Sequence, residues 1–153
     1  MNPAQAGKAF KLFSDKLIKE SRVAEVAALT TLNGDLQGRI FNQGKATDGS
    51  SLGTYRSKSY KKKRQNPPDG SGGRQIIKKD LQFYGDLRGN ISLGITNGNK
   101  NALGFKSDGA RLIATYQEGK RQVGKPIFTP SKGELDAMAA AYLKEVTKII
   151  RRV

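Results

Sequence analysis

The stretch SKGELDAMAAAYLKEVTKIIRR, residues 131–152, has the clearest pattern in the chain. Its apolar side chains recur at the i, i+3, i+4, i+7 spacing that places a continuous stripe on one face of an α-helix. Ser131 and Glu134 have the spacing of a capping box, in which the serine hydroxyl accepts a hydrogen bond from the glutamate amide. The stretch therefore predicts an amphipathic C-terminal helix over 131–153.

A small antiparallel sheet is predicted ahead of this helix, within residues 76–130. Apolar side chains alternate with polar residues and glycine over 90–96, which is the period-2 pattern of a half-buried strand. Asn97-Gly98 is a strong short signal for a hairpin turn, and it predicts a return strand over 101–106. Residues 112–116 fit either a third strand or a helical turn, and the sequence leaves both open.

The N-terminal part of the chain, residues 1–44, has helical periodicity. Pro3 suits the first turn of a helix, and apolar residues follow it at helical spacing with some drift. Asn33-Gly34 predicts a break, because glycine costs about 1 kcal/mol relative to alanine inside a helix. We therefore expect two helices, or one kinked helix followed by a second over 35–42.

These patterns predict a single α+β domain over residues 1–153, with N-terminal helices and a C-terminal helix packed on the small antiparallel sheet. A chain of 153 residues is most simply one domain and is long enough to bury a core. The apolar positions of the three patterns are the expected core: Phe10, Phe13, Leu17, Ile91, Leu93, Ile95, Leu135, Met138, Tyr142, Val146 and Ile149.

A long basic loop over residues 45–75 is expected between the patterned regions, because this segment has no sustained period. Residues 67–73 combine two prolines with three glycines, which continue neither a helix nor a strand. Residues 56–80 contain nine Lys or Arg against Asp69 and Asp80, so 9 − 2 = +7 of the net charge of +15 lies there. Such a polar insert adds little to a core and usually contacts a partner, sometimes becoming ordered only on binding.

The candidate partner-facing or DNA-facing side chains are the cations and the second tyrosine of this insert. Three interpretations remain open. The cations neutralise nucleic-acid phosphates while a tyrosine stacks on a base, they dock on a protein partner such as an acidic neighbouring subunit, or they belong to a solvated loop. The residues concerned are Arg56, Lys58, Tyr60, Lys61, Lys62, Lys63 and Arg64.

The composition argues against catalysis. The chain contains neither histidine nor cysteine, which removes the commonest general base, the commonest metal ligand and all thiolate chemistry. The 13 acidic residues include no pair that stands out at metal-binding or acid–base spacing. We therefore predict that the protein is not an enzyme and has no catalytic residue, metal site or cofactor.

The cellular location is predicted from the same totals. No apolar run approaches the roughly 20 residues that cross a bilayer, and the N-terminus has no secretory pattern. The protein is therefore expected to stay in the cytosol without contacting a membrane. A pI of about 10.2 favours a polyanion or an acidic protein as the partner.

The order of several segments resembles the tailed-phage virion morphogenesis, or tail completion, proteins, which are related to the small neck proteins of the head–tail junction. The family has a helical region, a "PdG" segment, a glycine–leucine step into a strand, a "y-q-x-G" segment and a short entry into a final helix. Thr47 stands where that family has proline, and Leu52 stands where it has an aromatic residue. The segments that carry the resemblance are Arg39-Ile40-Phe41, 46–52, 84–91, 102–105, 114–119 and 125–131.

This resemblance implies a structural virion protein that acts in viral assembly. Copies of the chain would form an oligomeric ring in the neck and connect the tail to the connector below the capsid. The implied partners are other copies of the chain and the neighbouring connector, neck and tail proteins, with DNA in the channel as a further candidate. The implied location is the head–tail junction of the virion, with the host cytoplasm during assembly. A small basic nucleic-acid-binding protein is the alternative.

Overall fold

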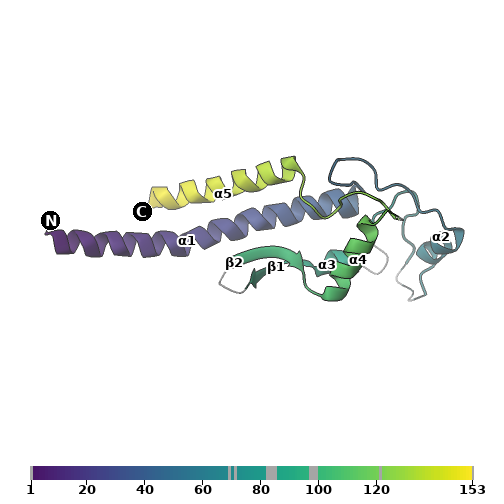
Figure 1. Ribbon diagram of the computed structural model, residues 1–153, viewed down its shortest axis with the longest axis horizontal. Coiled ribbons are helices and arrows are strands. Elements are labelled where there is room, and N and C mark those ends of the chain that lie inside the picture. The colour runs from purple at the N-terminus through teal and green to yellow at the C-terminus, as the bar shows by residue number, and fades with distance from the viewer. Residues whose placement is uncertain are drawn as a thin grey trace. The chain divides into compact units, whose positions relative to one another are not determined.

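The computed structural model describes residues 2–68, 70, 72–81, 86–96, 100–120 and 122–152 (Figure 1). The fold is α+β, as predicted: helices dominate, and the two strands form one antiparallel sheet. In chain order the elements are α1 (Pro3–Gln37), the π-helix η1 (Gly38–Asn42), α2 (Lys58–Gln65), α3 (Asp86–Asn90), β1 (Ile91–Thr96), β2 (Lys100–Phe105), α4 (Asp108–Glu118) and α5 (Lys132–Arg152).

The chain divides into two compact units. Unit 1 comprises Met1–Leu32, Leu93–Leu103 and Lys132–Val153, and unit 2 comprises Asn33–Ser92 and Gly104–Ser131. The helix α1 and both strands therefore supply residues to each unit.

Unit 1 contains the first part of α1 together with α5 and the facing ends of the two strands. Ala24, Ala28 and Leu32 follow one another at i, i+4 along α1 and are buried, as is Ile149 of α5. Asn101 of β2 donates from Nδ2 to Glu25 Oε2 of α1 at 2.9 Å. The predicted C-terminal helix is confirmed, because α5 spans Lys132–Arg152.

The predicted break at Asn33-Gly34 is wrong, because α1 continues through both residues to Gln37. The stripe of i, i+4 residues goes on as Leu36 and Ile40, which are both buried. Tertiary burial of such a stripe outweighs the cost of about 1 kcal/mol for one glycine. Gln37 Nε2 also donates to Asn33 Oδ1 at 3.1 Å across the predicted break. The helix then ends in the π-helix η1, at the predicted end near residue 42.

Residues 112–116, for which the sequence allowed either a strand or a helical turn, belong to the helix α4 in unit 2. Ser107 is its N-cap, since its Oγ accepts from the Ala110 amide at 3.2 Å. The helix buries Ala110 and Ala114 and packs on α3. The strands β1 and β2 confirm the two strands of the predicted hairpin, whose turn at Asn97-Gly98 lies outside the described residues.

The predicted core is only partly correct. Phe10, Phe13 and Leu135 are exposed, so these three predictions are wrong. Periodicity identifies the apolar face of a helix but does not show whether another element covers that face. Ile91 and Ile149 are buried as predicted, whereas Leu17, Leu93, Met138, Tyr142 and Val146 are half-buried, and the side chain of Ile95 lies outside the description. Most of the buried apolar residues belong to unit 2: Leu36, Ile40, Phe41, Ala46, Leu52, Tyr55, Leu87, Ile91, Ala110, Ala114 and Ile127.

Candidate partner-binding surface

The basic segment is not a continuous loop, because residues 58–65 form the helix α2. Ser57 caps this helix, since its Oγ accepts from the Tyr60 amide at 3.2 Å. Lysine, arginine and glutamine have good intrinsic helix propensity, which favours a helix here despite the lack of an apolar stripe. The amide of Asn66 closes the other end by donating to Lys62 O at 2.9 Å, just ahead of Pro67.

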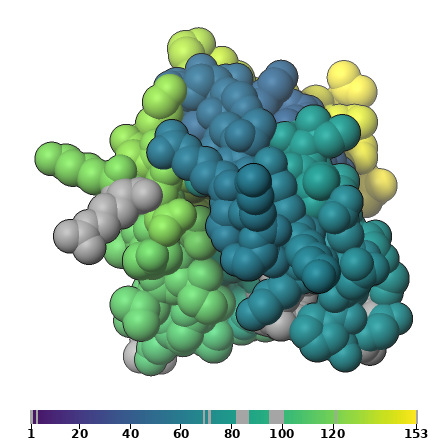
Figure 2. Space-filling model, turned by 90° about the vertical axis from the view of Figure 1, so that its right-hand side faces the viewer, coloured from purple at the N-terminus to yellow at the C-terminus, as the bar shows by residue number. Residues whose placement is uncertain are grey.

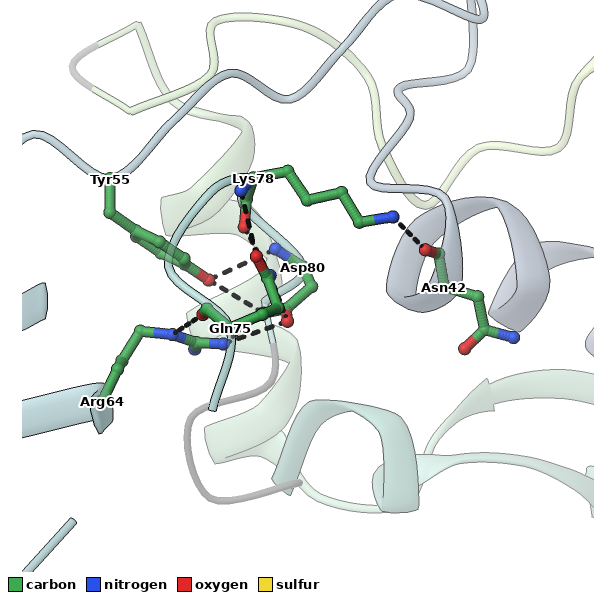
Figure 3. A network of polar contacts seen from close by, with 6 residues as sticks. All are labelled: Asn42, Tyr55, Arg64, Gln75, Lys78 and Asp80. Atoms are coloured by element: carbon green, nitrogen blue, oxygen red, sulfur yellow. Dashed lines mark hydrogen bonds and ion pairs between the residues drawn. The ribbon is translucent and has the colours of Figure 1, made fainter. Parts of the chain in front are cut away.

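The prediction that Arg64 faces a partner is wrong, because its side chain is fully buried. Arg64 Nη2 donates to both carboxylate oxygens of Asp80, at 2.9 and 3.0 Å (Figure 3). Arg64 Nε donates to the backbone oxygen of Gln75 at 3.0 Å. A buried charge needs a partner of opposite sign together with hydrogen bonds, and Arg64 has both. Its role is therefore to anchor α2 inside unit 2.

Tyr55 completes the environment of this ion pair. Its hydroxyl donates to Asp80 Oδ1 at 2.9 Å and accepts from the Asp80 amide at 3.2 Å. The Arg64 guanidinium carbon lies over the Tyr55 ring, 4.5 Å from its centroid, which is cation–π geometry. Burial raises the pKa of the Tyr55 phenol well above its usual range, so the hydroxyl keeps its proton and remains a donor.

Gln75 and Lys78 extend the network towards the end of η1 (Figure 3). Gln75 Nε2 donates to Asp80 Oδ2 and to Lys78 O, both at 2.6 Å, and Gln75 Oε1 accepts from the Lys78 amide at 3.0 Å. The Lys78 ammonium donates to the backbone oxygen of Asn42. Across the described residues, no buried side-chain nitrogen or oxygen lacks a hydrogen-bond partner.

The chain between Arg64 and Arg74 is closed at its base. The Arg74 amide donates at 2.8 Å to the backbone oxygen of Arg64, the residue whose side chain anchors α2. The C-terminus of α2 is thus fixed by its side chain and by its backbone.

The opposite side of α2 carries Lys58, Lys62 and Lys63, which are all exposed and are called the cationic face below. The segment that contains α2 lies at the surface of the molecule in Figure 2. Tyr60 and Lys61 are half-buried, and the Tyr60 ring packs 5.2 Å from the Tyr55 ring, centroid to centroid. Six of the seven predicted partner-facing residues thus keep solvent access, and their contact with a partner stays a prediction.

Two further cations, Arg56 just ahead of α2 in the sequence and Lys79 beyond it, lie close to each other. Arg56 is exposed and Lys79 is half-buried. Burial lowers the pKa of the Lys79 ammonium, and the positive charge of Arg56 lowers it further. Within the described part of the chain, no ion pair includes Arg56, Lys79 or a lysine of the cationic face.

Another polar cluster joins the turn at residues 47–50 to Lys125. Asp48 Oδ1 accepts from the amide and the hydroxyl of Ser50, at 2.9 and 2.5 Å. Lys125 Nζ donates to Asp48 Oδ2 at 3.2 Å and to Ser50 Oγ at 2.7 Å. The hydrogen bonds from Ser50 and then the lysine lower the pKa of the Asp48 carboxyl to about 2.

The Asp48 carboxyl is expected to titrate with a midpoint near 2 in an NMR pH titration of its side-chain carbon. A depressed pKa in the folded state stabilises the protein above the ordinary value of 3.8, and this contribution is lost as the pH falls towards 2. Ser50→Ala should move the midpoint up towards 3.8, whereas Ser59→Ala, distant in sequence, should leave it unchanged. A wild-type midpoint near 3.8 would show that the turn lacks these bonds in solution.

Arg39 connects the same region to the end of α1. Its guanidinium donates from Nη1 to Lys45 O and from Nη2 to Thr129 O, both at 3.1 Å. The Thr47 amide donates to Pro126 O at 3.0 Å, and the Thr47 hydroxyl donates to Thr129 O at 2.7 Å. Three segments that are far apart in the sequence are therefore joined by hydrogen bonds within unit 2.

The described residues include no group of three His, Cys, Asp or Glu side chains that could hold a metal ion. None of the helices in this part of the chain combines the length and the apolar character that crossing a membrane requires. Comparison of the chain with protein-family models, with curated proteins and with solved structures finds no match.

Proposed function

We propose that this chain is a structural protein of a tailed-phage virion, a tail completion or head–tail joining component of the neck. In this proposal identical copies form a ring that connects the tail to the capsid connector, and the protein performs no chemical reaction. The order of the segments that resemble the family leads to this assignment. The geometry of the chain supports an assembly role independently.

The segments that carry the resemblance are linked in space. Arg39 bonds to Thr129, and Thr47 bonds to Pro126 and Thr129, so three of the resembling segments pack together in unit 2. Residues 86–91 of a fourth segment form α3 and the start of β1, while residues 84 and 85 lie outside the described residues. Motifs that are individually short thus belong to one folded unit, which supports treating them as a set.

The observation that carries the proposal is the amount of apolar surface left uncovered on α1 and α5. Phe10, Leu12 and Ile18 of α1 are 74%, 71% and 60% exposed. At about 100° per residue, Leu12 lies roughly 200° around the helix from Phe10, so the two side chains are on different faces. A helix that is apolar on several faces is normally surrounded by protein. The chain therefore needs neighbours around its N-terminal helix.

The second uncovered patch lies on α5. Leu143 and Ile150 are both 62% exposed, whereas Ile149 of the same helix is buried in unit 1. The two patches are on different helices and differ in sequence. Contacts between unlike patches of identical copies are heterologous, and they generate rings when the rotation closes. We take the neighbours of α1 and α5 to be further copies of the chain.

Self-association is the direct test. The purified full chain should elute as a discrete oligomer in size-exclusion chromatography with light scattering and should show rings by negative-stain microscopy. Phe10→Asp should weaken association about 30-fold or more, since burying one Phe contributes roughly 2 kcal/mol and the new carboxylate would be desolvated. Helix content by circular dichroism should not change.

Gln5→Glu is the matched control, because it adds the same charge at an exposed polar position of the same helix. It should leave the oligomer intact. A wild-type chain that remains monomeric at high concentration would contradict the proposal, as would a Phe10→Asp variant that assembles normally. Portal, capsid and tail genes beside the gene for this chain are the expected genomic context.

A further inference from the structure

We propose that the cationic face of α2 binds the phosphate backbone of double-stranded DNA without reading its sequence. This inference rests on the proposed function, in which a ring would surround the path of the DNA, and it names one partner of that ring.

The charge around α2 is not balanced within the described chain. Residues 54–68 contain no Asp or Glu. Asp80, which does approach this helix, is already engaged by Arg64, Tyr55 and Gln75. The lysines of the cationic face therefore repel one another with no carboxylate paired to them, and a polyanion would relieve that repulsion.

The side chains on this face favour phosphate over a protein carboxylate. Arginine pairs in a bidentate manner with carboxylate and with phosphate alike, and the arginine of α2 points inward to Asp80, so the outward face relies on lysine. Protein–protein interfaces are rich in aromatic residues and arginine and depleted in lysine, whereas the outward side chains here are lysines. Lysines act as mobile point charges, which suits contacts with a repeating backbone.

The spacing of the lysines matches the density of phosphates. From Lys58 to Lys63 the helix rises about 7.5 Å, at roughly 1.5 Å per residue. A duplex carries one negative charge per about 1.7 Å of its axis, so it presents about four charges over that length. All three lysines can therefore engage phosphates at the same time. Arg56, two residues ahead of Lys58, and its neighbour Lys79 form a second cationic position.

The positions of Tyr55 and Tyr60 favour duplex DNA over single-stranded DNA as the partner. Binding of single strands relies on aromatic rings that stack on exposed bases. Tyr55 is buried under Arg64, and the Tyr60 ring packs on Tyr55, so neither ring is presented on the cationic face. The predicted contact is therefore limited to phosphates, with no preference for single strands and no preference among sequences.

The test is a salt titration of binding to a fluorescent 20-base-pair duplex, measured by anisotropy with the full chain. Each phosphate contact contributes about −0.9 to the slope of log K against log salt. The variant Lys58→Gln/Lys62→Gln/Lys63→Gln should lose about 2.7 from that slope. Between 50 and 200 mM salt, three contacts correspond to a change of about 40-fold in affinity, so the wild type should lose about 40-fold more affinity than the variant over this range.

The matched control is Lys106→Gln/Lys120→Gln/Lys144→Gln, which removes the same charge from exposed lysines outside α2. Its slope should stay close to that of the wild type. Equal slopes for the two triple variants would overturn the inference, as would tighter binding of single strands or no binding at 50 mM salt. Rings that do not bind DNA would overturn this inference alone, whereas DNA binding by a chain that forms no rings would overturn only the proposed function.

Discussion

Asp80→Ala is expected to destabilise unit 2 by about 3–5 kcal/mol, because it leaves the Arg64 guanidinium buried without a counter-charge. The same change removes two further hydrogen bonds to the carboxylate, one from the Tyr55 hydroxyl at 2.9 Å and one from Gln75 Nε2 at 2.6 Å. Marginal stability makes a loss of this size a large fraction of the total free energy of unfolding. Urea unfolding followed by circular dichroism measures it.

The double variant Arg64→Met/Asp80→Leu separates the ion pair from the packing. Replacing a buried pair by apolar side chains of similar volume is often close to neutral, so the double variant should be more stable than Asp80→Ala. The cationic face should also be retained in the double variant, with its salt-dependent DNA binding. A loss below about 1 kcal/mol for Asp80→Ala would show that Arg64 reaches solvent in solution.

Gly44→Ala is expected to cost about 2–5 kcal/mol. Gly44 has φ of +65°, and a Cβ added there would lie 2.6 Å from the backbone oxygen of Lys79. The left-handed conformation costs a non-glycine residue roughly 1–2 kcal/mol, and crowding against backbone adds roughly 1–3 kcal/mol. The displaced segment leads directly into Asp80, so the substitution should also loosen the network around Arg64.

Gly49→Ala is the control for the crowding term. Gly49 has φ of +78°, but a Cβ there would meet no atom within 4 Å, so only the conformational cost of roughly 1–2 kcal/mol applies. The difference between the two variants in urea unfolding isolates the contact with Lys79. Equal losses would mean that the chain around residue 79 yields without cost.

Local patterns predicted the elements that carry their own periodicity. The apolar stripe of α5 and the alternation of β1 determine structure within a single segment, and both elements form where they were expected. The continuation of α1 through Gly34 was not predictable in the same way, because it depends on the burial of Leu36 and Ile40 by residues elsewhere in the chain.

The candidate surface was predicted in composition but not in arrangement. Lys61 to Arg64 are four consecutive cations, and nothing in that run shows that the last of them pairs with Asp80. Two signals could have indicated the helix: Ser57 at an N-cap position, and Tyr60 with Arg64 at i, i+4 on one face. The sequence distance between Arg64 and Asp80 hides the ion pair, since only the folded chain brings them together.

The bond that closes the chain between Arg64 and Arg74 has a practical consequence for imaging an assembled particle. Lengthening a loop whose two ends are joined raises the entropic cost of closing it by only about 0.6 kcal/mol for each doubling of its length. Gly72 is exposed and has φ of +81°, so residues are better added after it than substituted for it. A short epitope inserted directly after Gly72, with the glycine retained, should therefore report where each copy sits at little cost to the fold.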